Sequence, residues 1–189
     1  MRTDEEVKKK PTRFSNTNII QIPIPCGNKR DIYERIQDNK ARFRDGKLFM
    51  EDTYMRFIMN STEEFSDAFQ LLLNKENYPI LITSDLGKDR VGLFMAMLFT
   101  MLDVPRETII REYMFSLDHV DPSFMAKKVS SLSSDSQETM TVLLSVNESF
   151  LNMAFKEIEN RFGSFDNFRE IGLRLSSKKQ QKLKDILLN

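Results

Sequence analysis

Hydrophobic side chains recur at helical spacing along most of the chain, and this pattern predicts the larger elements. Residues 61–64 (Ser-Thr-Glu-Glu) fit a capping box and apolar residues follow at helical spacing, so a helix is expected from there to near Lys75. Residues 32–57 are charged with scattered aromatics and are expected to form two helices joined by a turn at Asp45-Gly46. Further helices are expected over residues 91–102, 106–117 and 149–162, from Ser164, and from Ser176 or Ser177.

Two short segments instead show the pattern of strands. Residues 18–24 alternate apolar and polar side chains, and Pro23 indicates a sheet edge or a strand end. Residues 79–83 form an apolar, β-branched run that suits a strand buried on both faces. Together with the helices around them, these segments predict a single α/β domain over residues 1–189, with a small, mainly parallel sheet flanked by helices and a helical C-terminus.

The composition narrows the classes of function. Lys and Arg number 28, and Asp and Glu also number 28, so a formal net charge of zero gives no global field that would favour nucleic acid. No apolar run is long enough for a membrane span and the charged start carries no secretory signal, so a cytoplasmic location is expected. One Cys excludes an internal disulfide, and one Cys with one His excludes the common zinc clusters, so neither a metal nor a cofactor is expected. The chemistry therefore falls to hydroxyls, carboxylates, Lys, Arg and backbone amides.

Residues 84–90 have the composition of an anion-binding loop. The sequence Ser-Asp-Leu-Gly-Lys-Asp-Arg follows the predicted buried strand and precedes an apolar helix. Loop amides and the first amides of that helix can point inward, and Arg90 can hold two oxygens of a tetrahedral anion such as phosphate. A nucleotide-binding Walker loop does not fit, because Ile82 stands where its first Gly should be and Asp89 follows Lys88.

The 84–90 loop also has the spacing of a phosphatase signature. Ser84-x5-Arg90 matches Cys-x5-Arg, and residues 87–92 (Gly-Lys-Asp-Arg-Val-Gly) resemble the H-C-x-x-G-K-D-R-T-G loop of the bacterial and fungal tyrosine/serine phosphatase family, some of whose members hydrolyse phosphoinositides. The similarity covers nearly the whole chain, because it extends to residues 2–6, 22–24, 111–116 and 150–188. The family normally carries a further N-terminal stretch that includes a "DLR" strand, and we expect this stretch to be missing here.

The resemblance implies a protein-tyrosine-phosphatase-like fold and covalent phosphoryl transfer. In that mechanism a Cys thiolate attacks phosphorus, loop amides and Arg hold the equatorial oxygens, and an acid protonates the leaving oxygen. The implied substrates are phosphorylated proteins or phosphoinositides, with dual specificity left open, and a phosphate or sulfate ion would fit the loop. The residues carried over are Ser84 at the nucleophile position, Arg90 and Asp89 for catalysis, and Asp85, Leu86, Gly87, Lys88, Val91 and Gly92 for substrate binding.

The chain departs from the family at the nucleophile. Position 84 is Ser, and Thr83 stands where the family has His. A hydroxyl is far less acidic than a thiol and no adjacent base compensates, so the chain is expected to bind a phosphorylated ligand with little or no turnover. Two explanations stay open: Ser84 replaces the Cys of an enzyme and leaves an inactive or substrate-trapping form, or it is native to a pseudophosphatase that only binds. An interaction scaffold without an anion site is a third hypothesis.

Two aspartates compete for the role of general acid. The resemblance assigns that role to Asp89, whose alternative role is a helix cap that orders the loop. Asp52 precedes the loop by a few tens of residues, where many phosphatases keep a mobile acid. Its alternative role is that of a solvated surface carboxylate beside Glu51.

Two further regions carry weaker candidates. Cys26 is the only thiol, lacks an Arg at the x5 spacing, and is interpreted as a structural or incidental residue. Residues 118–145 include a Ser-rich tract at 130–136 and are expected to form a flexible link or a helical lid. The residues of this region that are candidates to line the site are His119, Phe124 and Met125.

Overall fold

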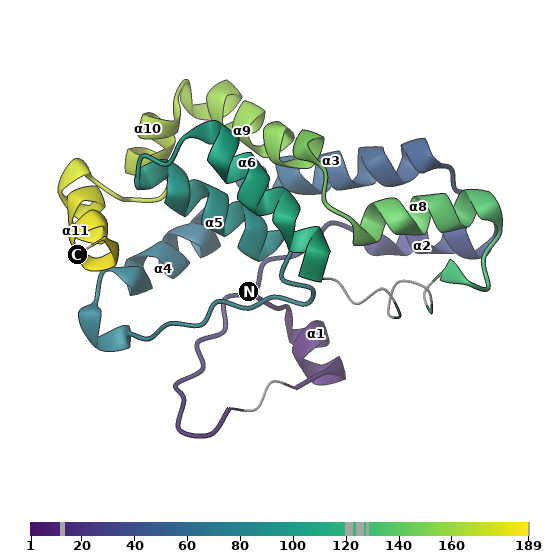
Figure 1. Cartoon of the computed structure of the whole chain (residues 1–189), viewed down its shortest axis with the longest axis horizontal. Coiled ribbons are helices and arrows are strands. Elements are labelled where there is room, and N and C mark those ends of the chain that lie inside the picture. Colours follow the sequence, from purple (N-terminus) through teal and green to yellow (C-terminus); the bar gives the residue numbers. More distant parts are fainter. Residues whose placement is uncertain (12–13, 120–122, 124–126, 128, 189) are drawn as a thin grey trace.

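Helices make up most of the described molecule (Figure 1). The computed structural model describes residues 1–11, 14–119, 123, 127 and 129–188. The first part of the chain contains α1 (Asp4–Lys9), α2 (Lys29–Gln37), α3 (Phe43–Asn60), α4 (Thr62–Leu72) and the 3₁₀ turn η1 (Lys75–Asn77). The rest contains α5 (Arg90–Met101), α6 (Arg106–Phe115), η2 (Ser116–His119), α8 (Ser134–Leu144), α9 (Glu148–Phe162), α10 (Phe165–Asn167), the π turn η3 (Phe168–Gly172) and α11 (Ser177–Leu187).

The hydrophobic core is shared among the longer helices. The helix α3 packs against both α8 and α9, and α5 packs against α6. Phe69 of α4 stacks on Phe94 of α5 with ring centroids 4.2 Å apart. Tyr54 and Phe57 of α3 and Phe150 of α9 are fully buried. These large rings bury the apolar faces that the helical spacing of the sequence predicts, and burial of each stabilises the fold by roughly 2 kcal/mol.

The α/β prediction is wrong for this molecule, because no strand occurs among the described residues. Residues 18–24 and 79–83 are extended rather than helical, but neither pairs with a neighbouring strand. Leu81 is 69% exposed, although the apolar run around it predicts a strand buried on both faces. An extended segment becomes a strand only when a neighbour accepts and donates its backbone hydrogen bonds. Here the carbonyl of Thr83 accepts from the amino group of Met1 instead.

Most of the helical predictions are confirmed. The helices α5, α6 and α9 lie over the expected ranges 91–102, 106–117 and 149–162 to within a few residues. Gly163 ends α9, and Ser164 and Ser176 cap the two helices that follow it. Local spacing and capping residues therefore predict the C-terminal third well.

Two details of the helical prediction are wrong. The expected turn at Asp45-Gly46 lies inside α3, where the Asp45 carboxylate accepts a hydrogen bond from the backbone amide of Arg42 at 2.8 Å. Gly46 serves close packing instead, because a Cβ atom at this position would lie 3.0 Å from the carbonyl oxygen of Thr139 in α8. Ser61 does precede α4, but its side chain makes no capping hydrogen bond.

The predicted lid region contributes at least one helix to the body of the molecule. The helix α8 packs against α2 and α3 (Figure 1), and the hydroxyl of Ser136 donates to the carbonyl oxygen of Ile36 at 3.0 Å. The last residues of the Ser-rich tract therefore form the first turn of the packed helix α8. Phe124, Met125 and the side chain of His119 lie outside the described part of the chain, and a lid function for residues 118–145 stays a prediction.

Candidate functional site

The 84–90 loop joins the extended segment 79–83 to the start of α5. Gly87 has a φ of +78°, a backbone conformation that side chains with a Cβ adopt only with strain. This turn brings the amide of Gly87 to within 3.1 Å of the Ser84 hydroxyl oxygen, to which it donates a hydrogen bond. The loop therefore turns back on the side chain at position 84 and directs one backbone amide at it, which is one element of an anion-binding nest.

The side chain of Arg90, where the loop joins α5, is held by several acceptors. Its side chain is 3% exposed, and Nη1 and Nη2 donate to the two carboxylate oxygens of Glu6 at 2.7 and 2.8 Å. Nη1 also donates to the carbonyl oxygens of Met1 at 2.7 Å and Ile24 at 3.1 Å. Among the described residues, no acceptor is found for its Nε–H. One edge of the guanidinium is thus fixed by protein, and the edge that includes Nε keeps a donor without an acceptor among the described residues.

Glu6 is a site residue that the sequence analysis did not identify. It lies in α1, where it forms a capping box with Thr3. Burial opposes its charge, but hydrogen bonds from Arg90 and Thr3 and the charge of Arg90 outweigh burial and lower the pKa of Glu6 to about 2. Glu6 is therefore an anion at neutral pH and a charge partner for Arg90. The one signal in the sequence is the Thr3-x-x-Glu6 spacing of the capping box.

Asp89 and Lys88, which directly precede Arg90 in the chain, form a second ion pair. The Lys88 side chain is 2% exposed, and its Nζ donates to Oδ1 of Asp89 at 2.7 Å. The hydroxyl of Tyr54 in α3 donates to the same oxygen at 3.0 Å. Tyr54 in turn lies 2.7 Å, oxygen to oxygen, from the hydroxyl of Tyr113 in α6. Neither tyrosine could be assigned to the site from the sequence, since neither is near the loop in the chain.

The remaining loop residues divide into exposed and packed positions. Asp85, Leu86 and Gly87 are exposed at the surface of the loop. Val91 and Gly92 lie in the first turn of α5, where a Cβ atom at position 92 would lie 3.0 Å from the ring of Tyr113. Ser84, Asp89 and Arg90 thus lie in one short segment, in which Tyr54 holds Asp89 and Glu6 holds Arg90. Contact of these residues with a substrate stays a prediction.

Comparison with known proteins agrees with this loop. The model of the tyrosine phosphatase family matches residues 1–189. The chain belongs to the tyrosine phosphatase family. No curated protein sequence matches it. The resemblance drawn from the loop is therefore confirmed at the level of the family, which supports a phosphatase-type function.

Asp52, the alternative acid, lies elsewhere. Its carboxylate pairs with Arg56 in the next turn of α3 at 2.5 Å, and both residues line a pocket of about 570 Å³. Residues two positions apart on a helix do not face each other. Since Tyr54 faces Asp89, Asp52 on the same helix points in another direction from the acid of the 84–90 loop.

Cys26, the only thiol of the sequence, lies near the site without the properties of a nucleophile. Burial raises the pKa of its thiol to about 11, although the nearby charges of Arg90 and Lys29 act in the opposite direction. The thiol is therefore protonated at neutral pH, and only the thiolate is strongly nucleophilic.

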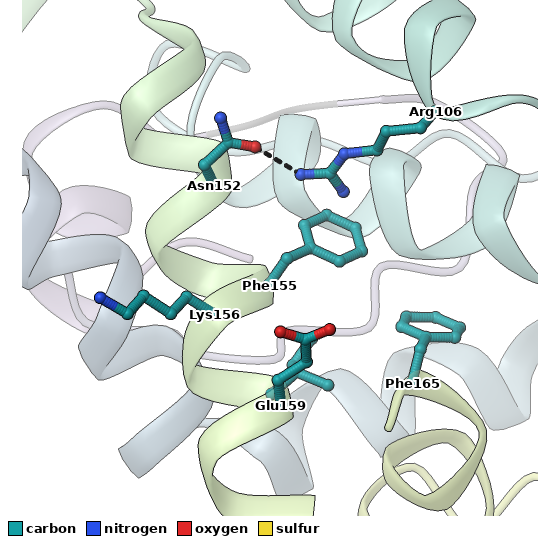
Figure 2. A pocket seen from close by; sticks show the side chains of 7 residues that line it. Arg106, Asn152, Phe155, Lys156, Glu159 and Phe165 are labelled. Carbon is teal, nitrogen blue, oxygen red and sulfur yellow. Dashed lines mark hydrogen bonds between the residues drawn. The ribbon is translucent and has the colours of Figure 1, made fainter. Parts of the chain in front are cut away.

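Another pocket, of about 380 Å³, lies between α6, α9 and α10 (Figure 2). The Arg106 guanidinium lies 3.8 Å from the centroid of the Phe155 ring and donates to Asn152 at 2.6 Å. These contacts join the start of α6 to α9. None of the residues that line this pocket belongs to the 84–90 loop.

Metal clusters and membrane-spanning helices are both absent from the described ranges. Within them, no group of three or more His, Cys, Asp and Glu side chains is arranged to hold a metal ion. Nor does any helix in that part of the chain have the length and hydrophobicity needed to cross a membrane.

Proposed function

We propose that the 84–90 loop binds the phosphate group of a phosphorylated protein, and that the chain is a protein-tyrosine-phosphatase-type phosphomonoester hydrolase whose nucleophile position holds Ser84. The observation that carries this proposal is the state of Arg90. Glu6 fixes one edge of its guanidinium, and the Nε edge has no acceptor among the described residues. A guanidinium held in this way is oriented before a ligand arrives, so binding a tetrahedral dianion requires little reorganisation.

The reaction proposed for a form with Cys at position 84 proceeds in two displacements. The thiolate forms an S–P bond while the bond from phosphorus to the leaving oxygen breaks, and Asp89 gives that oxygen a proton. Water then attacks phosphorus, its proton returns to Asp89, and inorganic phosphate and the thiolate are released. Asp89 is favoured over Asp52 because it immediately precedes Arg90, whereas Asp52 pairs with Arg56 beside a pocket that no residue of the 84–90 loop lines.

Ser84 is proposed to make the present chain inactive or substrate-trapping. Its hydroxyl must lose a proton to attack phosphorus, and the neighbouring residue is Thr83 rather than a base. The loop otherwise keeps its geometry, because the Ser84 oxygen accepts the hydrogen bond of the Gly87 amide. Binding without turnover is the result.

The second candidate function is a pseudophosphatase that binds phosphorylated ligands and does not hydrolyse them. The hydrogen bond between Gly87 and Ser84 favours it, because the Ser hydroxyl is accommodated by the loop at 3.1 Å. Under this proposal Ser84 is native, and the same Arg90 edge holds the ligand.

The Ser84→Cys variant separates the two functions. It is assayed with p-nitrophenyl phosphate, phosphotyrosine peptides and phosphoinositide vesicles, in a Cys26→Ser background that leaves one thiol. Vanadate-sensitive turnover supports the enzyme, and its distribution over the three substrates assigns the class. The matched control, Ser84→Cys with Arg90→Met, is expected to be inactive. Phosphate binding by calorimetry without any turnover supports the pseudophosphatase, and loss of both overturns the proposed site.

A further inference from the structure

The two hydrogen bonds that link Tyr113, Tyr54 and Asp89 allow only one assignment of donors and acceptors. The Asp89 carboxylate accepts hydrogen bonds, so the single hydroxyl proton of Tyr54 is used for Oδ1 of Asp89 at 3.0 Å. The contact of 2.7 Å between the two tyrosine hydroxyls must then use the proton of Tyr113. Burial raises the pKa of both tyrosines, so both hydroxyls keep their protons and remain donors. The chain of donors runs from Tyr113 to Tyr54 to Asp89.

The two carboxylate oxygens of Asp89 therefore differ in their hydrogen bonds. Oδ1 accepts from Tyr54 and from Lys88 Nζ, at 3.0 and 2.7 Å. Oδ2 has no hydrogen-bond partner among the described residues. A proton carried by Asp89 therefore resides on Oδ2, because two donors already occupy Oδ1.

We propose that Tyr54 is a positioning residue that directs the proton of Asp89. It holds Oδ1 toward the core between α3 and α6, and in doing so it turns Oδ2 toward the leaving oxygen of the substrate. Tyr113 supports Tyr54 and does not touch Asp89. This inference rests on the proposed function, since it concerns the acid of that reaction.

Packing alone does not require this arrangement. The rings of Tyr54 and Tyr113 meet edge to face with centroids 6.2 Å apart, and two Phe rings can pack in the same way. The two hydroxyls belong to α3 and α6, and the hydrogen bonds that they form lead to Asp89, the N-cap residue of α5. Asp89 makes no side-chain capping bond there, so its carboxylate is used by the tyrosine and lysine donors instead.

The test uses the dependence of rate on the leaving group. In the Ser84→Cys form, Tyr54→Phe is expected to lower kcat for phenyl phosphate by roughly tenfold, because phenoxide needs a proton as it leaves. Turnover of p-nitrophenyl phosphate, whose leaving group departs as an anion, is expected to change less than about twofold. Tyr78→Phe is the matched control, because the Tyr78 hydroxyl donates to the carbonyl of Leu72, outside the site.

The outcomes distinguish the positioning role of Tyr54 from the proposed function of the 84–90 loop. A selective loss on phenyl phosphate supports the positioning role. Equal losses on both substrates, or no loss, overturn it while leaving the proposed function in place. If Tyr54→Phe does not fold, Tyr113→Phe replaces it: a smaller selective loss supports the proposal and equal losses overturn it.

An inactive Ser84→Cys form would instead count against the enzyme. The unaltered chain then provides the readout, by calorimetry with inorganic phosphate. Freed from Tyr54, an oxygen of Asp89 can turn toward the bound anion and repel it, so Tyr54→Phe is expected to weaken binding several-fold. Unchanged affinity, or no phosphate binding by either protein, overturns the positioning role.

Discussion

The two sides of the 84–90 loop are built in different ways. On one side, Asp89 rests on hydroxyls that project from the packed helices α3 and α6. On the other side, Arg90 is held by the Glu6 carboxylate and by the carbonyl oxygens of Met1 and Ile24, which lie outside any helix. The first, which we call the helical side, depends on buried rings and hydroxyls in addition to the ion pair of Lys88 with Asp89. The second, which we call the extended side after the chain at Met1 and Ile24, depends on the charge contact of Arg90 with Glu6.

This difference predicts different sensitivities. Charge contacts respond to pH and to removal of one partner, because a half-buried ion without its counter-ion is costly. A packed hydroxyl network responds to volume, because helices with a full core cannot accept additional atoms. Each side can therefore be perturbed separately.

The largest effect is expected from Arg90→Met. The substitution leaves Glu6 partly buried without its cation, and we expect the free energy of unfolding to fall by about 3 kcal/mol. Urea denaturation measures the loss. Because part of this cost is the unpaired carboxylate, adding Glu6→Gln to Arg90→Met is expected to restore some stability.

An exposed pair provides the comparison for that measurement. Arg30 and Glu34 also meet at 2.7 Å, but their side chains are 81% and 57% exposed. Exposed pairs contribute less than about 1 kcal/mol, so Arg30→Met is expected to have a small effect. Equal losses from Arg30→Met and Arg90→Met would show that the extended side does not depend on its charge contact.

Helices could be predicted from the sequence because their signals are local. The apolar residues of α5 are spaced so that they form its buried face, and this spacing can be read within the helix itself. Similarly, Ser176 caps α11 from the position just before the helix. The extended segments have local signals as well, but a strand also requires a partner. The apolar character of Leu81 indicates extended structure without indicating what pairs with it.

The site was predictable only along the loop itself. The x5 spacing picks out Ser84 and Arg90, and the family resemblance picks out Asp89, because the loop is one continuous segment; their contact with a substrate stays a prediction. Their partners do not, since Tyr54 is 35 residues from Asp89 and Glu6 is 84 residues from Arg90. Only the fold brings these residues together, and a single sequence carries no signal for that contact.

The extended side is also expected to give the protein a specific pH dependence. The Glu6 carboxyl is more acidic in the folded chain, with a pKa of about 2 against its ordinary 4.5. The unfolded chain therefore binds more protons between these values, and acid favours unfolding. The contribution, about 3 kcal/mol at most, is complete above pH 4.5 and is lost as the pH falls toward 2.

Urea midpoints of the unaltered protein and of Glu6→Gln, measured from neutral pH into acid, check this dependence. The unaltered protein is expected to be the more stable at neutral pH, and the difference is expected to shrink on acidification. The same comparison in an Arg90→Met background should be less dependent on pH, because the main cause of the low Glu6 pKa is then removed. A difference that stays constant into acid would contradict the charge contact.

The smallest effect tests the helical side through its volume. A Cβ atom at position 92 would lie 3.0 and 3.1 Å from two atoms of the Tyr113 ring, so Gly92→Ala must displace that ring. We expect a loss of about 1 kcal/mol, because the strain exceeds the gain in helix propensity. The sequence has no Trp, so near-ultraviolet circular dichroism reports the altered tyrosines directly.

Gly87→Ala is the matched control for Gly92→Ala, because it places the same methyl group where no atom lies within 4 Å. Its cost comes from the φ of +78°, and we expect it to reshape the loop and weaken phosphate binding without altering the tyrosine spectrum. Gly92→Ala is expected to have the opposite effects: it changes the tyrosine spectrum and leaves the turn from Ser84 to Gly87 in place. If both variants change the spectrum equally, the two sides of the loop are not separate, and the tyrosine network extends into the turn at Gly87.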